Sequence, residues 1–198
     1  MMNYYNKYKR EILRGVDTYW LSEPLRTAFI HRHTLNVDGG DEAFRYNLAL
    51  NYGNEPGVMK ESNRHTLGLS LNLQYRRKKW NISNQLSLNN TVGNNTPYGS
   101  FSEYTRLNPY YSKTDENGNI TKVIEHKPLG SGMQLVEVTN PLYNVQFPFK
   151  DMTENFNLTD NFSLEYAMRE NLRFSVQASF TKGVARSEQF RSMNHTAF

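Results

Sequence analysis

The segment FRYNLALNY, residues 44–52, alternates strictly between two kinds of side chain. Its even positions are Phe, Tyr or Leu, and its odd positions are Arg, Asn or Ala. Because successive side chains of a β-strand point to opposite faces, this segment predicts a strand with one apolar and one polar face. Four further segments alternate in the same way: Thr66–Tyr75, Trp80–Asn89, Phe156–Met168 and Leu172–Thr181. A short strand, His33–Val37, is predicted before residue 44.

The connections between these strands are alternately short and long. The short ones are residues 38–42, 76–79 and 168–171, and the long ones are 53–64 and 90–155. Outer-membrane barrels have tight periplasmic turns and extended outward loops, whereas a connection as long as the second is uncommon in a compact soluble domain. The pattern therefore predicts an all-β fold, an antiparallel up-and-down transmembrane β-barrel segment with long extracellular loops.

The alternation assigns each side chain of the predicted strands to lipid or to the barrel interior. We expect the lipid-facing side chains to be Leu67, Leu69, Leu71, Leu73, Ile82, Leu86, Leu88, Phe162, Leu164, Phe174 and Val176. We expect the side chains that face the lumen or a plug to be Asn72, Gln74, Ser83, Gln85, Ser87, Ser163, Glu165, Arg173, Ser175 and Gln177.

The predicted strands are too few to close a membrane barrel, because the smallest have about eight strands and large transporters about 22. We therefore expect about six strands of a larger, roughly 22-stranded barrel. Residues 1–30 are expected to form an outward loop segment that can include a short helix. Residues 31–182 are expected to form the barrel hairpins, with the extracellular loop at 90–155, and 183–198 the start of the next loop.

Composition is compatible with this prediction. Aromatic residues make up 13% of the chain, and several lie near predicted strand ends, where rings suit a membrane–water boundary: Tyr52, Tyr75, Trp80, Tyr166 and Phe180. The net charge of +4 includes one basic run, Arg76–Lys79, in a predicted turn, so nucleic-acid binding is not predicted. Met1–Arg14 lacks the apolar core of a signal peptide, so a membrane location would require an export signal upstream.

The sequence offers little catalytic or metal-binding chemistry. It has no cysteine, and it lacks the glycine-rich, nucleophile-elbow and zinc-protease motifs. His31 and His33 have no nearby carboxylate in sequence. Asp115, Asn117 and Asn119 imitate the start of a calcium loop, but Ile120 and His126 stand where that loop requires Gly and Glu. We predict no enzymatic activity, no cofactor and no metal site.

The first part of the long loop is rich in aromatic and polar side chains that can stack on sugars or hold a peptide backbone. The same rings could instead pack the loop onto its neighbours, and the sequence leaves both interpretations open. The candidate substrate or lid contacts are Tyr98, Phe101, Tyr104, Arg106, Tyr110 and Tyr111. A hairpin is predicted around Gly118, between Tyr110-Tyr111 and Ile120–Ile124, and its tip is expected to be solvated.

Five phrases, in this order, resemble the SusC/RagA-type TonB-dependent outer-membrane transporters of Bacteroidota. They are Val16–Leu21 with Pro24–Thr27, His33–Gly40 with Arg45–Tyr52, Gly57–Lys60 with Ser62 and Arg64, Pro97–Phe101 with Leu107–Tyr111, and Asn140–Asn144. The resemblance covers roughly residues 17–180. The family's signal peptide, plug and TonB box have no counterpart here, so we expect them upstream of Met1 and further strands beyond Phe198.

The resemblance implies energised import of an oligosaccharide or peptide across the outer membrane. It also implies a SusD-like surface lipoprotein over the barrel, contact with outer-membrane lipid, and a TonB complex acting through the missing plug and TonB box. The alternative is a secreted or surface β-rich carbohydrate-binding module without transport activity.

Overall fold

The computed structural model describes residues 2–129 and 134–198. Its main feature is one six-stranded antiparallel sheet with the order β1-β2-β3-β4-β7-β8. The strands are β1 (His31–Gly40), β2 (Phe44–Pro56), β3 (Asn63–Arg77), β4 (Trp80–Asn94), β7 (Phe149–Arg169) and β8 (Leu172–Arg191). Each strand pairs with the next along the chain, except that β7 follows β4 after a long excursion. The predicted up-and-down arrangement is confirmed for these strands.

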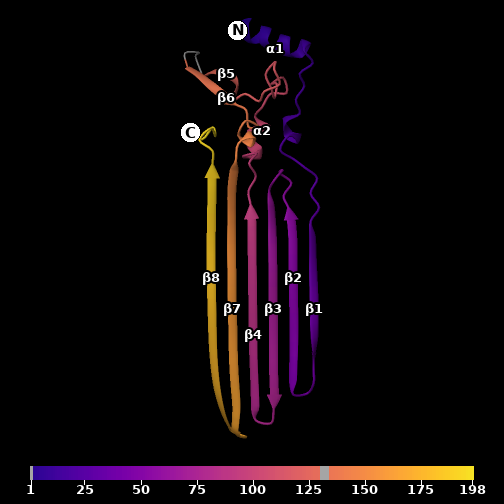
Figure 1. Cartoon of the computed structure of the whole chain (residues 1–198), viewed down its shortest axis with the longest axis vertical. Helices are drawn as coiled ribbons and strands as arrows, with labels where there is room; N and C mark the ends of the chain where they lie inside the picture. The colour runs from indigo at the N-terminus through magenta and orange to yellow at the C-terminus, as the bar shows by residue number, and fades with distance from the viewer. Residues whose placement is uncertain (1, 130–133) are drawn as a thin grey trace.

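The two ends of the sheet differ as the connection lengths predicted. At one end, tight turns join β1 to β2, β3 to β4 and β7 to β8 (Figure 1). The other end carries the connection from β2 to β3 and the excursion between β4 and β7, and both chain termini lie there (Figure 1). We call these the turn end and the loop end.

The strand register confirms the predicted division into two faces. Residues that pair across strands share a face, and Leu50, Leu69 and Leu88 form one such row. Another row joins Asn47, Asn72 and Gln85 on the opposite face. Every residue predicted to face lipid lies on the first face, the apolar face, and every residue predicted to face the lumen lies on the second, the polar face.

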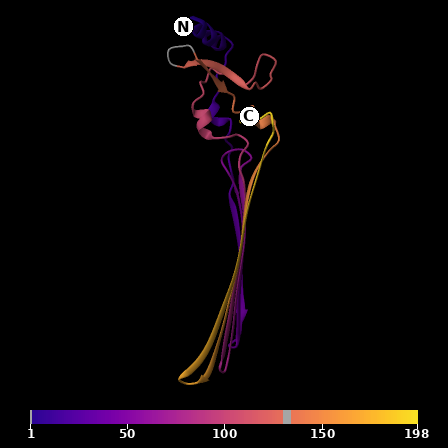
Figure 2. The same ribbon diagram turned by 90° about the vertical axis from the view of Figure 1, so that its left-hand side faces the viewer.

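Neither face of the sheet is covered by another layer of the described chain. Seen edge-on, the sheet is a single thin layer (Figure 2). The apolar face therefore exposes many large side chains, among them Leu35, Phe44, Tyr52, Leu67, Trp80, Phe162, Leu172, Phe174, Phe180 and Phe190. A soluble sandwich would bury such a face against a second sheet. This sheet has no core of its own.

A polar contact interrupts the apolar face near its middle. Asn84 on β4 and Asp160 on β7 both lie among apolar neighbours, and Asn84 Nδ2 donates a hydrogen bond of 2.6 Å to Asp160 Oδ1. Charged pairs on the same face lie closer to the loop end, where Lys150 contacts Glu188 at 2.6 Å. The apolar stretch is thus bounded by polar contacts on that side.

A small subdomain stands above the loop end of the sheet (Figures 1 and 2). It combines the N-terminal segment with the excursion between β4 and β7, and we call it the rim subdomain. Its elements are α1 (Met2–Leu13), η1 (Trp20–Ser22), α2 (Phe101–Thr105), β5 (Val123–Leu129), β6 (Gln134–Thr139) and η2 (Asn144–Gln146). The buried hydrophobic core of the described chain lies here, in Trp20, Tyr104, Tyr111 and Leu142.

The strands are longer than predicted, most of all at the C-terminal end of the sheet. The last strand, β8, runs to Arg191, so residues 183–191 continue the sheet instead of starting a loop. Its extension pairs with a longer β7, and the pairing includes the Lys150–Glu188 contact. Phe180 consequently lies in mid-strand and not at a strand end. The long connection is shorter than predicted, residues 95–148.

The hairpin of the long connection is also displaced. Its strands are β5 and β6, whereas the predicted site around Gly118 forms only a turn. There the Asp115 carboxylate accepts hydrogen bonds from the backbone N–H groups of Asn117 and Asn119, which hold the pKa of Asp115 below its usual range. A short polar side chain that binds its own backbone favours a turn over a ladder. Asp115, Asn117 and Asn119, whose spacing resembles the start of a calcium loop, therefore form a turn.

The turn between β1 and β2 depends on glycine. Gly40 has φ of 130°, and a Cβ at this position would lie 2.0 Å from the carbonyl oxygen of Phe44. Asp41 then accepts hydrogen bonds from the backbone N–H groups of Ala43 and Phe44, each at 2.7 Å. These two bonds hold the pKa of the Asp41 carboxyl below its usual range. A backbone hydrogen bond of 2.7 Å from Arg76 N–H to the carbonyl of Ala43 ties this turn to the end of β3.

Candidate functional site

The rim subdomain is assembled from the sequence phrases that resemble the transporter family. Trp20 Nε1 donates to the carbonyl of Asn108 at 3.1 Å, and Thr18 Oγ1 donates to the carbonyl of Tyr111 at 2.9 Å. The segment Val16–Leu21 is thereby fixed to the segment Leu107–Tyr111. Asn140 is fully buried, and its side chain donates to the carbonyl of Lys113 at 2.9 Å. Buried polar groups require such partners, so the side chains of Thr18, Trp20 and Asn140 stabilise the fold of the rim subdomain.

A second set of contacts ties the N-terminal segment to the connection between β2 and β3. The Arg26 guanidinium donates to the carbonyls of Gly57 and Ser62. Lys60 Nζ donates in return to the carbonyl of Glu23 at 2.6 Å. Charged donors on backbone carbonyls are stronger than neutral hydrogen bonds. The segment before β1 is therefore held against the loop end of the sheet.

Two of the six candidate contact residues are buried in the subdomain core. Tyr104 is 1% exposed and Tyr111 is 2% exposed. Tyr104 Oη donates to the carbonyl of Tyr98 at 2.9 Å, and burial raises the pKa of Tyr104 far above its ordinary value. Tyr111 stacks on Tyr8, and burial together with this contact raises the pKa of Tyr8 to about 12. In this conformation Tyr104 and Tyr111 pack the subdomain, and no ligand can reach their rings.

The other four candidates lie nearer the surface but do not form one patch. Tyr98 is half-buried, with Lys60 Nζ 5.6 Å from the centre of its ring. Phe101 and Arg106 are exposed at the two ends of α2. Tyr110 is exposed beside α1, where it lines a shallow apolar hollow with Tyr5 and Ile12. Contact of these four residues with a substrate or lid stays a prediction.

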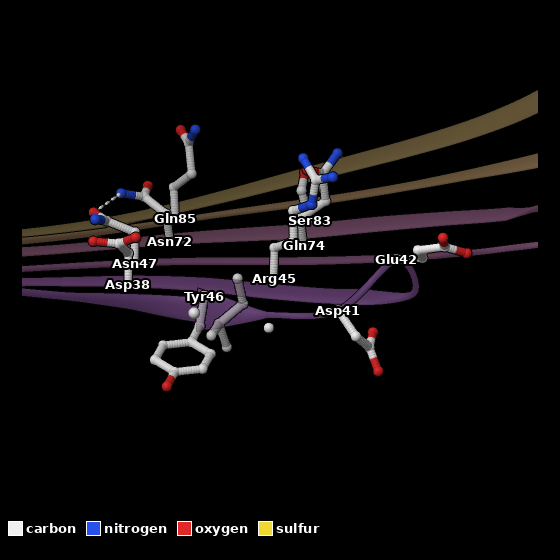
Figure 3. A pocket seen from close by; sticks show the side chains of 13 residues that line it. Asp38, Asp41, Glu42, Arg45, Tyr46, Asn47, Asn72, Gln74, Ser83 and Gln85 are labelled. Carbon is white, nitrogen blue, oxygen red and sulfur yellow. Dashed lines mark hydrogen bonds between the residues drawn. The ribbon is translucent and has the colours of Figure 1, made fainter.

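The polar face forms a hollow of about 810 Å³ near the turn end. Figure 3 shows Arg45, Gln74 and Ser83 projecting to one side of the sheet together with Asn47 and Asn72, whereas Tyr46 projects to the other side. Asn72 Nδ2 donates to Asn47 Oδ1 at 3.5 Å. These side chains present amide, hydroxyl and guanidinium groups, and Asp38 of β1 adds a carboxylate beside Asn47. Such a surface can hold water, a polar ligand or a polar protein segment.

A second hollow, which we call the rim pocket, lies where the polar face meets the rim subdomain. Its volume is about 740 Å³, within the range of roughly 300–1,000 Å³ typical of small-molecule sites. Its walls come from five separate regions: the connection after β2, the segment from Asn95 to Glu103, the segment with Pro141 and Asn144, the start of β7, and the chain from Arg191 to Ala197. No local sequence pattern joins these regions, so the pocket could not be predicted from the sequence.

No cluster of three or more His, Asp or Glu side chains that could hold a metal ion occurs in residues 2–129 and 134–198. His31 and His33 lie on the apolar face with ring centres 5.3 Å apart, and His31 Nε2 contacts Asn54.

Within the same described ranges, no helix has the length and apolar character needed to cross a membrane.

Comparison with known proteins gives matches among solved structures. No family model and no curated protein matches the chain. The RagAB peptide importer in its closed-closed state matches with a TM-score of 0.64 and 20% identity, over 90% of this chain and 20% of that chain. The RagAB peptide transporter matches with a TM-score of 0.64 and 20% identity, over 91% of this chain and 20% of that chain. The open-open state of the importer matches with a TM-score of 0.61 and 20% identity, over 90% of this chain and 20% of that chain.

The likeness is one of fold. At 20% identity, the matches show a similar arrangement of the backbone over about nine tenths of this chain. The chain spans about a fifth of the length of each of these solved chains. The solved structures are described as a peptide importer or transporter, and their likeness to this chain is in the fold alone.

Proposed function

We propose that this chain forms part of the wall of a TonB-dependent outer-membrane importer, with its apolar face toward lipid and its polar face toward the lumen. The observation that supports this most strongly is the uncovered sheet, on whose apolar face no second layer is formed by residues 2–129 and 134–198. Edge strands β1 and β8 expose unpaired backbone groups, and a membrane sheet must close to satisfy such groups. Further strands in a larger barrel, roughly 22 in all, would satisfy them.

The fold similarity to the RagAB importer supports the same proposal and extends it to partners. The rim subdomain then lies outside the cell, at the mouth of the barrel, where a SusD-like surface lipoprotein would cover it. A plug connected to TonB would occupy the lumen and contact the polar face, including the hollow at the turn end. The cargo would be a peptide or an oligosaccharide.

Energised uptake tests the proposal. In the source organism, deletion of the gene should abolish uptake of a labelled pool of di- and tripeptides or of a labelled pool of oligosaccharides. A protonophore should abolish the same uptake in the parent strain, because TonB-linked import draws on the proton gradient. The protein should fractionate with outer membranes. Unchanged uptake of both pools, with the protein recovered from the culture supernatant, would favour the secreted carbohydrate-binding module instead.

A further inference from the structure

The rim pocket contains charged groups of both signs that are not paired with one another. Asp151 pairs with Gln189 in the ladder between β7 and β8, and Arg191 pairs with Phe149. Asp151 and Arg191 are therefore diagonal neighbours on the polar face, and both line the pocket. Neither forms an ion pair within the described part of the chain.

The Asp151 carboxylate has unused hydrogen-bonding capacity. Its Oδ2 accepts only a long hydrogen bond, 3.5 Å, from Gln189 Nε2. Its Oδ1 is buried and has no partner within the described residues, so a donor from the pocket must reach the carboxylate through Oδ2. An ammonium group of a ligand at Oδ2 would add a charge-assisted hydrogen bond where the protein supplies only the long one.

Arg191 supplies the opposite charge in the pocket. The neighbouring imidazole of His195 does not compete for an anion as a second cation, because burial and the Arg191 charge hold the pKa of His195 below its usual range. His195 Nδ1 accepts a hydrogen bond from the backbone N–H of Ala197 at 3.0 Å. Its Nε2–H is then the ring's remaining donor.

The other carboxylate of the pocket is already engaged. Glu103 Oε1 accepts from the backbone N–H of Ser100 at 3.3 Å and forms the capping box of α2. The wall made by residues 195–197 is fixed by two hydrogen bonds between Asn144 and Thr196, at 2.8 and 3.0 Å. The pocket is therefore pre-formed, with Asp151 and Arg191 as its free charges.

We propose that the rim pocket binds the charged groups of a short zwitterionic peptide, the ammonium at Asp151 and the carboxylate at Arg191. Diagonal positions on a sheet face are about 7–8 Å apart, and two extended residues span about 7 Å. A neutral oligosaccharide would leave both charges without a counter-ion, and among the described residues Phe149 is the only Phe, Tyr or Trp that lines the pocket. The inference rests on the proposed import function, and selects peptides over glycans as cargo.

Binding to the intact protein in detergent tests the assignment without requiring transport. The probes are a pool of di- and tripeptides with free termini, the same pool acetylated and amidated, and maltotriose; the retained probes are measured by mass spectrometry after gel filtration. Retention of the free pool should exceed that of the blocked pool at least about tenfold, the effect expected for loss of a charged hydrogen bond. Asp151→Asn and Arg191→Gln should each lower retention by a similar factor.

The matched controls are Glu188→Gln and Arg186→Gln, which change one acid and one base of β8 on the apolar face. They should leave retention unchanged. Equal retention of blocked and free peptides, no retention of the free pool, or a preference for maltotriose would overturn the assignment. Energised uptake that persists with unaltered selectivity in the Asp151 and Arg191 variants would contradict peptide binding in the rim pocket. The proposed import function would still stand.

Discussion

Replacing Tyr104 with alanine is expected to unfold the rim subdomain while leaving the sheet in the membrane. Tyr104 is 1% exposed and lies in the same buried cluster as Trp20, Tyr111 and Leu142. Truncating a buried aromatic side chain costs about 3–5 kcal/mol, and this small core has few other residues to compensate. Limited proteolysis of the intact protein in outer-membrane vesicles should show new cleavage within residues 95–148.

Phe101→Ala is the matched control, because Phe101 belongs to the same short helix but is 38% exposed. It should leave the proteolytic pattern unchanged. If Tyr104 contacted substrate instead of packing the core, Tyr104→Ala would reduce uptake with no new cleavage. That result would contradict the structural role that burial gives to this residue.

Replacing Leu69 with arginine is expected to destabilise the barrel by about 2–4 kcal/mol, the cost of a cation facing lipid near the bilayer midplane. Leu69 lies on the apolar face between Leu50 and Leu88, within a stretch of alternating leucines. The free energy of unfolding, measured by denaturant titration of the intact protein in lipid vesicles, provides the test.

Ser70→Arg is the control for this substitution, since Ser70 is the next residue and lies on the polar face between Ala49 and Ser87. An arginine there should reach water and leave the free energy of unfolding within about 0.5 kcal/mol of the parent value. Equal destabilisation by both substitutions would mean that the two faces of β3 have the same surroundings.

The sheet could be predicted from the sequence because its determinants are local. Period-two alternation decides the face of each side chain, and a slip of one residue would reverse every assignment. The glycine of the first turn and the tight turn at residues 168–171 then fix how neighbouring strands meet. The end of β8 could not be predicted in this way, since Arg186 and Glu188 interrupt the apolar face and depend on partners in β7.

The rim subdomain was harder to predict because its contacts join distant parts of the chain. Thr18 meets Tyr111, and Arg26 meets Gly57. From sequence alone, Tyr104 and Tyr111 could serve as ligand contacts or as core residues, and only burial distinguishes the two roles. The rim pocket was missed for the same reason, since Asp151 and Arg191 become neighbours only through the register of β7 and β8.

Site-directed spin labelling shows most directly whether one face of this sheet meets lipid and the other meets water. The chain contains no cysteine, so single cysteines can be introduced along β3 without background labelling. In the intact protein in bilayers, labels at Leu67, Leu69, Leu71 and Leu73 should be accessible to oxygen, and labels at Gly68, Ser70, Asn72 and Gln74 to a water-soluble nickel complex. Accessibility that does not alternate along β3 would contradict the account.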